Sequence, residues 1–78
     1  MSVPKSIHHL RILKEFSNKP NKKMTDYERY LINYLSLPTA RKIIKELIDE
    51  NLISCQASTF DKRIKLLTVI ESNYDKFI

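Results

Sequence analysis

The stretch Ser36-Leu-Pro-Thr-Ala-Arg-Lys-Ile-Ile-Lys-Glu-Leu-Ile-Asp-Glu-Asn51 decides the fold of this chain. Its apolar residues recur three and four positions apart, which predicts a helix with one inward face. Ser36 suits the N-cap, Pro38 is tolerated in a first turn, and Asn51 readily takes the left-handed conformation that ends a helix. We therefore predict a helix over residues 36–51. Its inward face comprises Leu37, Ala40, Ile43 or Ile44, and Leu47.

The charges of this helix run against its macrodipole. The bases Arg41, Lys42 and Lys45 come first, and the acids Glu46, Asp49 and Glu50 follow. The reverse order would be more favourable by about a few tenths of a kcal/mol per exposed charge. A helix whose start faces the phosphates of a nucleic acid accepts this cost. The order of the charges therefore favours a polyanionic partner.

Two strands around a basic turn follow this helix. Residues 52–58 and 64–70 have the pattern of strands, and the second is rich in β-branched side chains. The segment Thr59-Phe-Asp-Lys-Arg63 between them is polar and basic, as expected of a hairpin tip. We predict a two-stranded β-hairpin over residues 52–70.

A helix is also predicted near the N-terminus. Pro4 suits the first turn of a helix over residues 4–17, in which apolar residues recur three apart. A polar loop over residues 18–23 follows, and residues 22–24 are predicted as a short β bridge. The inward residues of this first helix are Ile7, Leu10, Leu13 and Phe16.

A second helix is predicted over residues 25–35. Thr25 and Glu28 have the spacing of a capping box, in which each side chain bonds the other residue's backbone N–H. Tyr27, Tyr30 and Tyr34 then fall on one face with Leu31, and we assign these tyrosines to core packing. Ser72-Asn-Tyr-Asp75 resembles the start of a further, short C-terminal helix.

Composition restricts the classes of protein to which this chain can belong. The 78 residues, 42% hydrophobic and 29% charged, are expected to form one domain. There is no glycine, which excludes a phosphate-binding glycine loop and leaves tight turns to Asn, Asp, Ser or Lys. The single cysteine, Cys55, excludes an internal disulfide and a multi-cysteine zinc site, and we expect it to be buried in a strand. Without a signal peptide or a long apolar run, we expect a soluble cytoplasmic protein of a bacterium, an archaeon or a virus-infected cell.

The net charge of +5 and the pI near 9.5 favour an acidic partner. The excess is uneven: residues 1–23 carry +5, residues 24–51 carry −1 and residues 52–78 carry +1. The prediction of a nucleic-acid partner therefore depends more on where the bases lie than on their number.

The order of two helices, a basic helix and a hairpin is that of a winged helix-turn-helix, an α+β, mainly α, fold with a three-helix core. Within it, residues 25–70 resemble the multiple-antibiotic-resistance-regulator (MarR) family. The matching motifs are Leu35-Ser36, Ile43-Ile44 with Leu47, Asn51-Leu52-Ile53, Asp61-Lys62-Arg63 and Leu67-Thr68. Asn51 and Tyr34 stand where the family has glycines. We expect a minimal version without the long dimerisation helices and without a small-molecule ligand.

The resemblance and the charges imply a sequence-specific double-stranded DNA-binding domain that acts as a small transcriptional regulator. The basic helix would enter the major groove, where arginine suits guanine and lysine suits phosphate, and the hairpin would follow the backbone or minor groove. The start of the helix would bind a phosphate. The predicted DNA-binding residues are Ser36, Thr39, Arg41, Lys42, Lys45, Lys62 and Arg63.

Other functions and partners follow from the same residues. We find no set of catalytic residues and no cofactor motif, and the adjacent His8 and His9 lack the spacing of a metal site. A homodimer is expected because one such domain reads only one half-site. The alternatives are a winged helix that binds RNA, and a protein-interaction module of a nucleic-acid or viral assembly. The expected dimer contacts are the first helix with Tyr74, Phe77 and Ile78, and the working face of the interaction module would be Glu46, Asp49 and Glu50.

Overall fold

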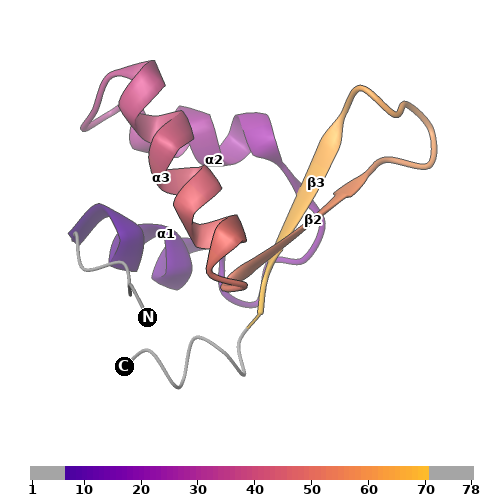
Figure 1. Ribbon diagram of the computed structural model, residues 1–78, viewed down its shortest axis with the longest axis horizontal. Coiled ribbons are helices and arrows are strands. Elements are labelled where there is room, and N and C mark those ends of the chain that lie inside the picture. The colour runs from indigo at the N-terminus through magenta and orange to yellow at the C-terminus, as the bar shows by residue number, and fades with distance from the viewer. Residues whose placement is uncertain (1–6, 71–78) are drawn as a thin grey trace.

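A computed structural model describes residues 7–70 as a mainly helical α+β fold. The helices pack against one another, and a long hairpin projects from them at the right of Figure 1. The predicted start of the first helix at residue 4 and the predicted C-terminal helix lie outside the described residues, as do Tyr74, Phe77 and Ile78. The elements are α1 (Ile7–Phe16), β1 (Lys22–Lys23), α2 (Met24–Leu31), α3 (Leu37–Asp49), β2 (Ile53–Ala57) and β3 (Lys65–Val69).

The sheet has three antiparallel strands in the order β1-β3-β2. In the β2–β3 hairpin, Ile53 pairs with Val69 at the base and Ala57 pairs with Lys65 at the outer end. The bridge predicted at residues 22–24 is confirmed as β1, in which Lys22 pairs with Leu67. This two-residue strand attaches the start of α2 to the central strand of the sheet and so fixes α2 relative to the hairpin.

The core lies where the three helices meet the base of the hairpin. Leu13, Leu31, Leu47 and Leu67 are fully buried, as the sequence predicted, and they come from four different elements. Burying such side chains contributes about 1.5–3 kcal/mol each. The remaining buried apolar side chains are Ile12, Phe16, Tyr27, Ala40, Ile43, Ile44, Leu52, Ile53 and Val69.

The predicted inward face of α1 is wrong by a fraction of a turn. Ile7 is 59% exposed and Leu10 is only half-buried, whereas Ile12 and His9 are buried. The reason is a long-range contact: His9 Nε2 lies 2.9 Å from Glu46 Oε1 of α3. With His9 facing α3 in this contact, Ile7 faces away from the core.

The predicted capping box at the start of α2 is absent. The helix begins at Met24, directly after β1, so Thr25 lies inside it, and the N-cap residue Lys23 makes no side-chain cap hydrogen bond. Glu28 therefore does not reach back to Thr25. Its carboxylate accepts a hydrogen bond from Arg41 of α3 instead.

α2 also ends at Leu31 rather than at the predicted residue 35. After it, the Asn33 side-chain amide donates to the carbonyls of Arg29 and Tyr30, and Tyr34 N–H donates to the Leu31 carbonyl three residues back. Of the tyrosines assigned to the core, Tyr27 is fully buried and stacks on Phe16 at 3.9 Å between ring centroids. Tyr34 follows the end of the helix and is half exposed.

α3 begins and ends as predicted within about two residues. Ser36 is its N-cap residue, although its hydroxyl does not bond the helix backbone. At the other end, Asn51 N–H donates to the Ile48 carbonyl and Leu52 N–H to the Leu47 carbonyl, the two hydrogen bonds of a Schellman motif. Asn51 has φ 61°, and the other described residues with positive φ are Asn18 and Asn21. Asparagine thus takes the place of the glycine that this chain lacks.

The prediction that Cys55 is buried is wrong. Burial along β2 falls from buried at Ile53 to exposed at Cys55 and beyond. Cys55 pairs with Leu67 of the central strand β3, which is fully buried, whereas β2 is an edge strand of the sheet. The core therefore covers β3 but not β2 at this point of the hairpin.

Candidate nucleic-acid interface

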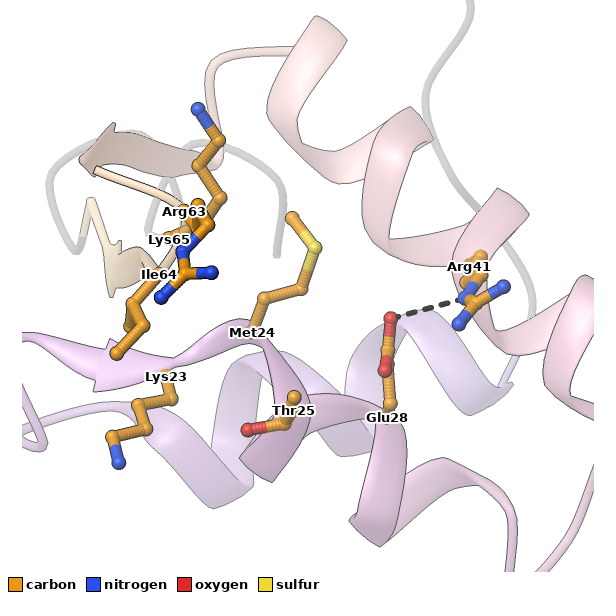
Figure 2. A pocket seen from close by; sticks show the side chains of 8 residues that line it. All are labelled: Lys23, Met24, Thr25, Glu28, Arg41, Arg63, Ile64 and Lys65. Atoms are coloured by element: carbon orange, nitrogen blue, oxygen red, sulfur yellow. Dashed lines mark hydrogen bonds and ion pairs between the residues drawn. The ribbon is translucent and has the colours of Figure 1, made fainter. Parts of the chain in front are cut away.

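α3 and the β2–β3 hairpin flank a common groove. The groove has a volume of about 380 Å³, and Met24, Thr25 and Glu28 of α2 lie between its two walls. Figure 2 shows Arg41 on one side of Met24, and Arg63 with Lys65 on the other. The lining residues are Lys23, Met24, Thr25, Glu28, Arg41, Arg63, Ile64 and Lys65. Four of these are cationic and one is a carboxylate, so the groove is a positively charged surface that α3, β1 and the hairpin supply.

On the α3 side, Arg41 is exposed and is also anchored. Its Nε donates to Glu28 Oε2 at 3.2 Å, with the Arg41 side chain 62% exposed and the Glu28 side chain 15% exposed. Lys45 follows one turn later, and its Nζ lies 3.8 Å from Oδ2 of Asp49. Arg41 and Lys45 both border a second, more apolar hollow with Ile44. These two cations therefore face the same side of α3.

On the hairpin side, Arg63 is oriented by a carboxylate of its own loop. Its guanidinium donates two hydrogen bonds to the carboxylate oxygens of Asp61, each 3.1 Å long, and its backbone N–H donates a third. The side-chain hydrogen bond and then the backbone one hold the pKa of the Asp61 carboxyl below its ordinary value. Because the Arg63 side chain is 91% exposed, the pair fixes the direction of the guanidinium without burying it.

The structure brings only some of the predicted DNA-binding residues together. Arg41 and Arg63 line the groove, and Lys45 borders the adjoining hollow. Lys42 and Lys62 are exposed but are not among the residues that line either. Ser36 and Thr39 are exposed at the start of α3, where the Ser36 hydroxyl donates to the Thr39 hydroxyl at 3.0 Å. This end of α3 presents two hydroxyls beside its first backbone N–H groups.

Sequence reasoning missed Lys23 and Lys65 as members of this surface. Both line the groove, Lys23 from β1 and Lys65 from the outer end of β3. The excess of bases before residue 24 was a signal for Lys23, but its place in the lining of the groove depends on the pairing of β1 with β3. Phe60 was also missed, and it is the most exposed large apolar side chain described, at 99%.

The acidic end of α3 is largely used within the protein. Glu46 bonds His9 of α1, and Asp49 lies near Lys45. His9 thus has a structural contact. Among residues 7–70, no group of three or more His, Cys, Asp or Glu side chains is arranged to hold a metal ion.

The helices described here are too short or too polar to cross a membrane. Comparisons with protein-family models, with curated proteins and with solved structures find no match to the chain.

Proposed function

We propose that this chain is a winged helix-turn-helix that binds double-stranded DNA sequence-specifically as a small transcriptional regulator. α3 would enter the major groove, and the β2–β3 hairpin would follow the backbone or the minor groove. The observation that carries this proposal is the shared groove, in which Arg41 of α3 and Arg63 of the hairpin face one side of the molecule. A duplex presents phosphates on both sides of a groove, which matches two separated cationic elements.

The carboxylate beside Arg41 is compatible with this proposal. Ion pairs with an exposed partner contribute about 0–1 kcal/mol, because water screens the charges and two side chains lose freedom. The Arg41 side chain is 62% exposed and that of Glu28 is 15% exposed, so exchanging Glu28 for a phosphate or a guanine edge costs about 1 kcal/mol, the upper end of this range. A good bidentate contact to a base discriminates by about 1–3 kcal/mol, which offsets that cost.

A charge reversal at Arg41 tests the proposal. Arg41→Glu is expected to weaken duplex binding by about tenfold or more, since it removes a contact and adds repulsion to phosphate. The measurement is fluorescence anisotropy with a mixed-sequence duplex at two salt concentrations. The matched control is Lys14→Glu, which changes the net charge equally at an exposed position on α1 outside the groove. Equal affinities of the two variants would contradict the groove assignment, and no binding by the unmodified protein at low salt would favour a protein partner.

A homodimer belongs to the same proposal, because a single module covers one half-site and buries limited surface on DNA. The exposed Ile7 of α1 is a described residue that such a contact would cover. Sedimentation at tens of micromolar, with and without duplex, tests it. A monomer under both conditions would remove the dimer from the proposal. Competition with single- and double-stranded RNA tests the RNA alternative.

A further inference from the structure

The tip of the β2–β3 hairpin carries a large apolar side chain that the rest of the described protein leaves uncovered. Phe60 is 99% exposed, whereas the other exposed large apolar side chains range from 37% to 59%. A fully exposed phenyl ring orders water around its whole surface, which is unfavourable in the free protein. Covering this ring by a binding partner is therefore favourable.

The loop that carries Phe60 is tied together by hydrogen bonds. Ser58 N–H donates to the Ile64 carbonyl at 2.8 Å and closes the loop, and Ile64 N–H donates to the Asp61 carbonyl at 2.9 Å. Phe60 N–H donates to the Ser58 hydroxyl at 3.2 Å. These bonds hold the backbone on both sides of Phe60 in one conformation. Little conformational entropy then remains to be lost when the ring meets a partner.

The surroundings of the ring favour nucleic acid over a protein pocket. Charged or hydroxyl side chains flank it in the sequence, and an apolar protein pocket would have to desolvate them. Cations next to an exposed apolar wedge are instead the combination with which minor-groove proteins unstack adjacent base pairs. Arg63 and Lys65 also line the groove, so Phe60 lies on the same hairpin as half of its cations. The flanking residues are Ser58, Thr59, Asp61, Lys62, Arg63 and Lys65.

We propose that Phe60 inserts between adjacent base pairs of the bound duplex from the minor groove and kinks it. This inference rests on the proposed DNA binding and adds a mode of recognition to it. Insertion is least costly at flexible pyrimidine–purine steps, so the hairpin would select sequence through deformability. Arg63 and Lys62 would bind phosphates beside the kink.

A tryptophan probe tests this insertion directly. The chain has no tryptophan, so Phe60→Trp introduces a single indole at the tip. The probe is a duplex of about 30 base pairs with TA steps, and binding is followed in parallel by anisotropy. We expect the emission of Phe60→Trp to be quenched on binding, because the indole stacks on bases, while the control Lys14→Trp on α1 keeps its emission.

Affinity and bending provide a second, independent readout. Phe60→Ala is expected to weaken binding about tenfold, within the range for loss of a base–aromatic stack. A kink shortens the distance between the two ends of the duplex, which energy transfer between dyes at those ends measures, and Phe60→Ala is expected to abolish this shortening. Phe60→Leu should retain part of the affinity and part of the bending, since leucine also serves as a wedge. The neighbouring Thr59→Ala should leave both the affinity and the bending unchanged.

The outcomes separate the two proposals. Binding by anisotropy with unchanged emission and unchanged bending would overturn the insertion of Phe60 and leave DNA binding in place. Absence of binding by the unmodified protein at low salt would overturn both. A blue shift of Phe60→Trp that grows with protein concentration without DNA would overturn insertion in favour of contact with a second copy.

Discussion

α3 and the β2–β3 hairpin supply the two walls of one groove, but they are anchored in opposite ways. α3 buries Ala40, Ile43, Ile44 and Leu47, so the helix that presents Arg41 rests on the core along its length. In the hairpin, Leu67 and Val69 of β3 are buried, but residues 55–57 of β2 are exposed and no residue of the tip, 58–64, is buried. Substitutions in α3 and in the hairpin therefore measure different quantities. A change on the buried face of α3 alters folding and binding together, whereas a change at the hairpin tip is expected to alter binding alone.

The largest expected effect is a loss of stability caused by a substitution in the core-facing side of α3. Leu47→Ala removes a fully buried side chain from α3 and is expected to lower the free energy of unfolding by about 2–5 kcal/mol. Phe60→Ala at the hairpin tip is expected to change it by less than about 0.5 kcal/mol. Urea unfolding followed by circular dichroism compares the two. Similar losses from both substitutions would show that the hairpin tip belongs to the cooperative core.

The second test concerns the two cations at the tip of the β2–β3 hairpin. Changing Lys62 and Arg63 together to Ala is expected to weaken duplex binding less than Arg41→Glu does. It should also reduce the steepness with which affinity falls with salt by about two, since each lost phosphate contact reduces that slope by about one. Anisotropy titrations over a series of salt concentrations measure the slope. An unchanged slope would mean that neither side chain contacts phosphate.

The third test addresses Tyr27, a buried side chain of α2. The Tyr27 ring is fully buried, and its hydroxyl has no hydrogen-bond partner within residues 7–70. Removing an unpaired buried polar group avoids a desolvation cost of about 1–3 kcal/mol. Tyr27→Phe is therefore expected to raise the free energy of unfolding by about 1 kcal/mol at neutral pH. A loss of stability would show that the hydroxyl has a partner, such as a bound water.

At alkaline pH, the difference in free energy of unfolding between Tyr27→Phe and the unmodified protein is expected to increase. Burial raises the pKa of the Tyr27 phenol above its ordinary value of 10.0, so above that pH the folded state holds a proton that the unfolded state has released. The free energy of unfolding then falls with pH, by up to about 1.4 kcal/mol per pH unit from this group. Tyr27→Phe lacks this contribution. Its advantage over the unmodified protein should therefore grow above about pH 10.

The smallest expected effect concerns the carboxylate between the two walls. Glu28→Gln keeps the size of the side chain and removes the charge that competes with DNA for Arg41. We expect duplex affinity to rise about threefold, the scale of an exposed ion pair. The control is Glu15→Gln on α1, which loses an equal charge from a pair with Lys19 outside the groove. An equal gain in both variants would indicate a general effect of net charge.

The contrast between the two walls also explains which regions of the fold were predictable. The period of α3 correctly identified Ala40, Ile43, Ile44 and Leu47 as its buried face. The prediction that Leu37 is inward is wrong, because this residue of the first turn lies at the end of the helix beyond the core and is exposed. The same reasoning failed in α1, where His9 is buried through its bond to Glu46, a residue 37 positions away that no local pattern reveals. It failed at Cys55 because β2 is an edge strand: the core covers the central strand at this level, where the pairing partner Leu67 is fully buried, and leaves Cys55 exposed.

Prediction of the candidate site was limited by the same physics. Arg41 and Arg63 were identifiable as residues of an exposed basic helix and an exposed basic turn. Lys23 joins them only because β1 pairs with β3, and that pairing depends on two residues that carry almost no strand signal of their own. Lys65 joins them because it begins β3, two residues after Arg63 at the outer end of the hairpin. Glu28 was assigned to a cap, since nothing local shows that α2 starts one residue earlier.

The exposed thiol on β2 has a practical consequence. Cys55 is the only cysteine in the chain, and it is accessible without belonging to the core or lining the groove. A maleimide dye can therefore be attached to the natural sequence at one defined point on the hairpin. Single-molecule recordings could then time the arrival and departure of the hairpin on DNA without any engineered residue.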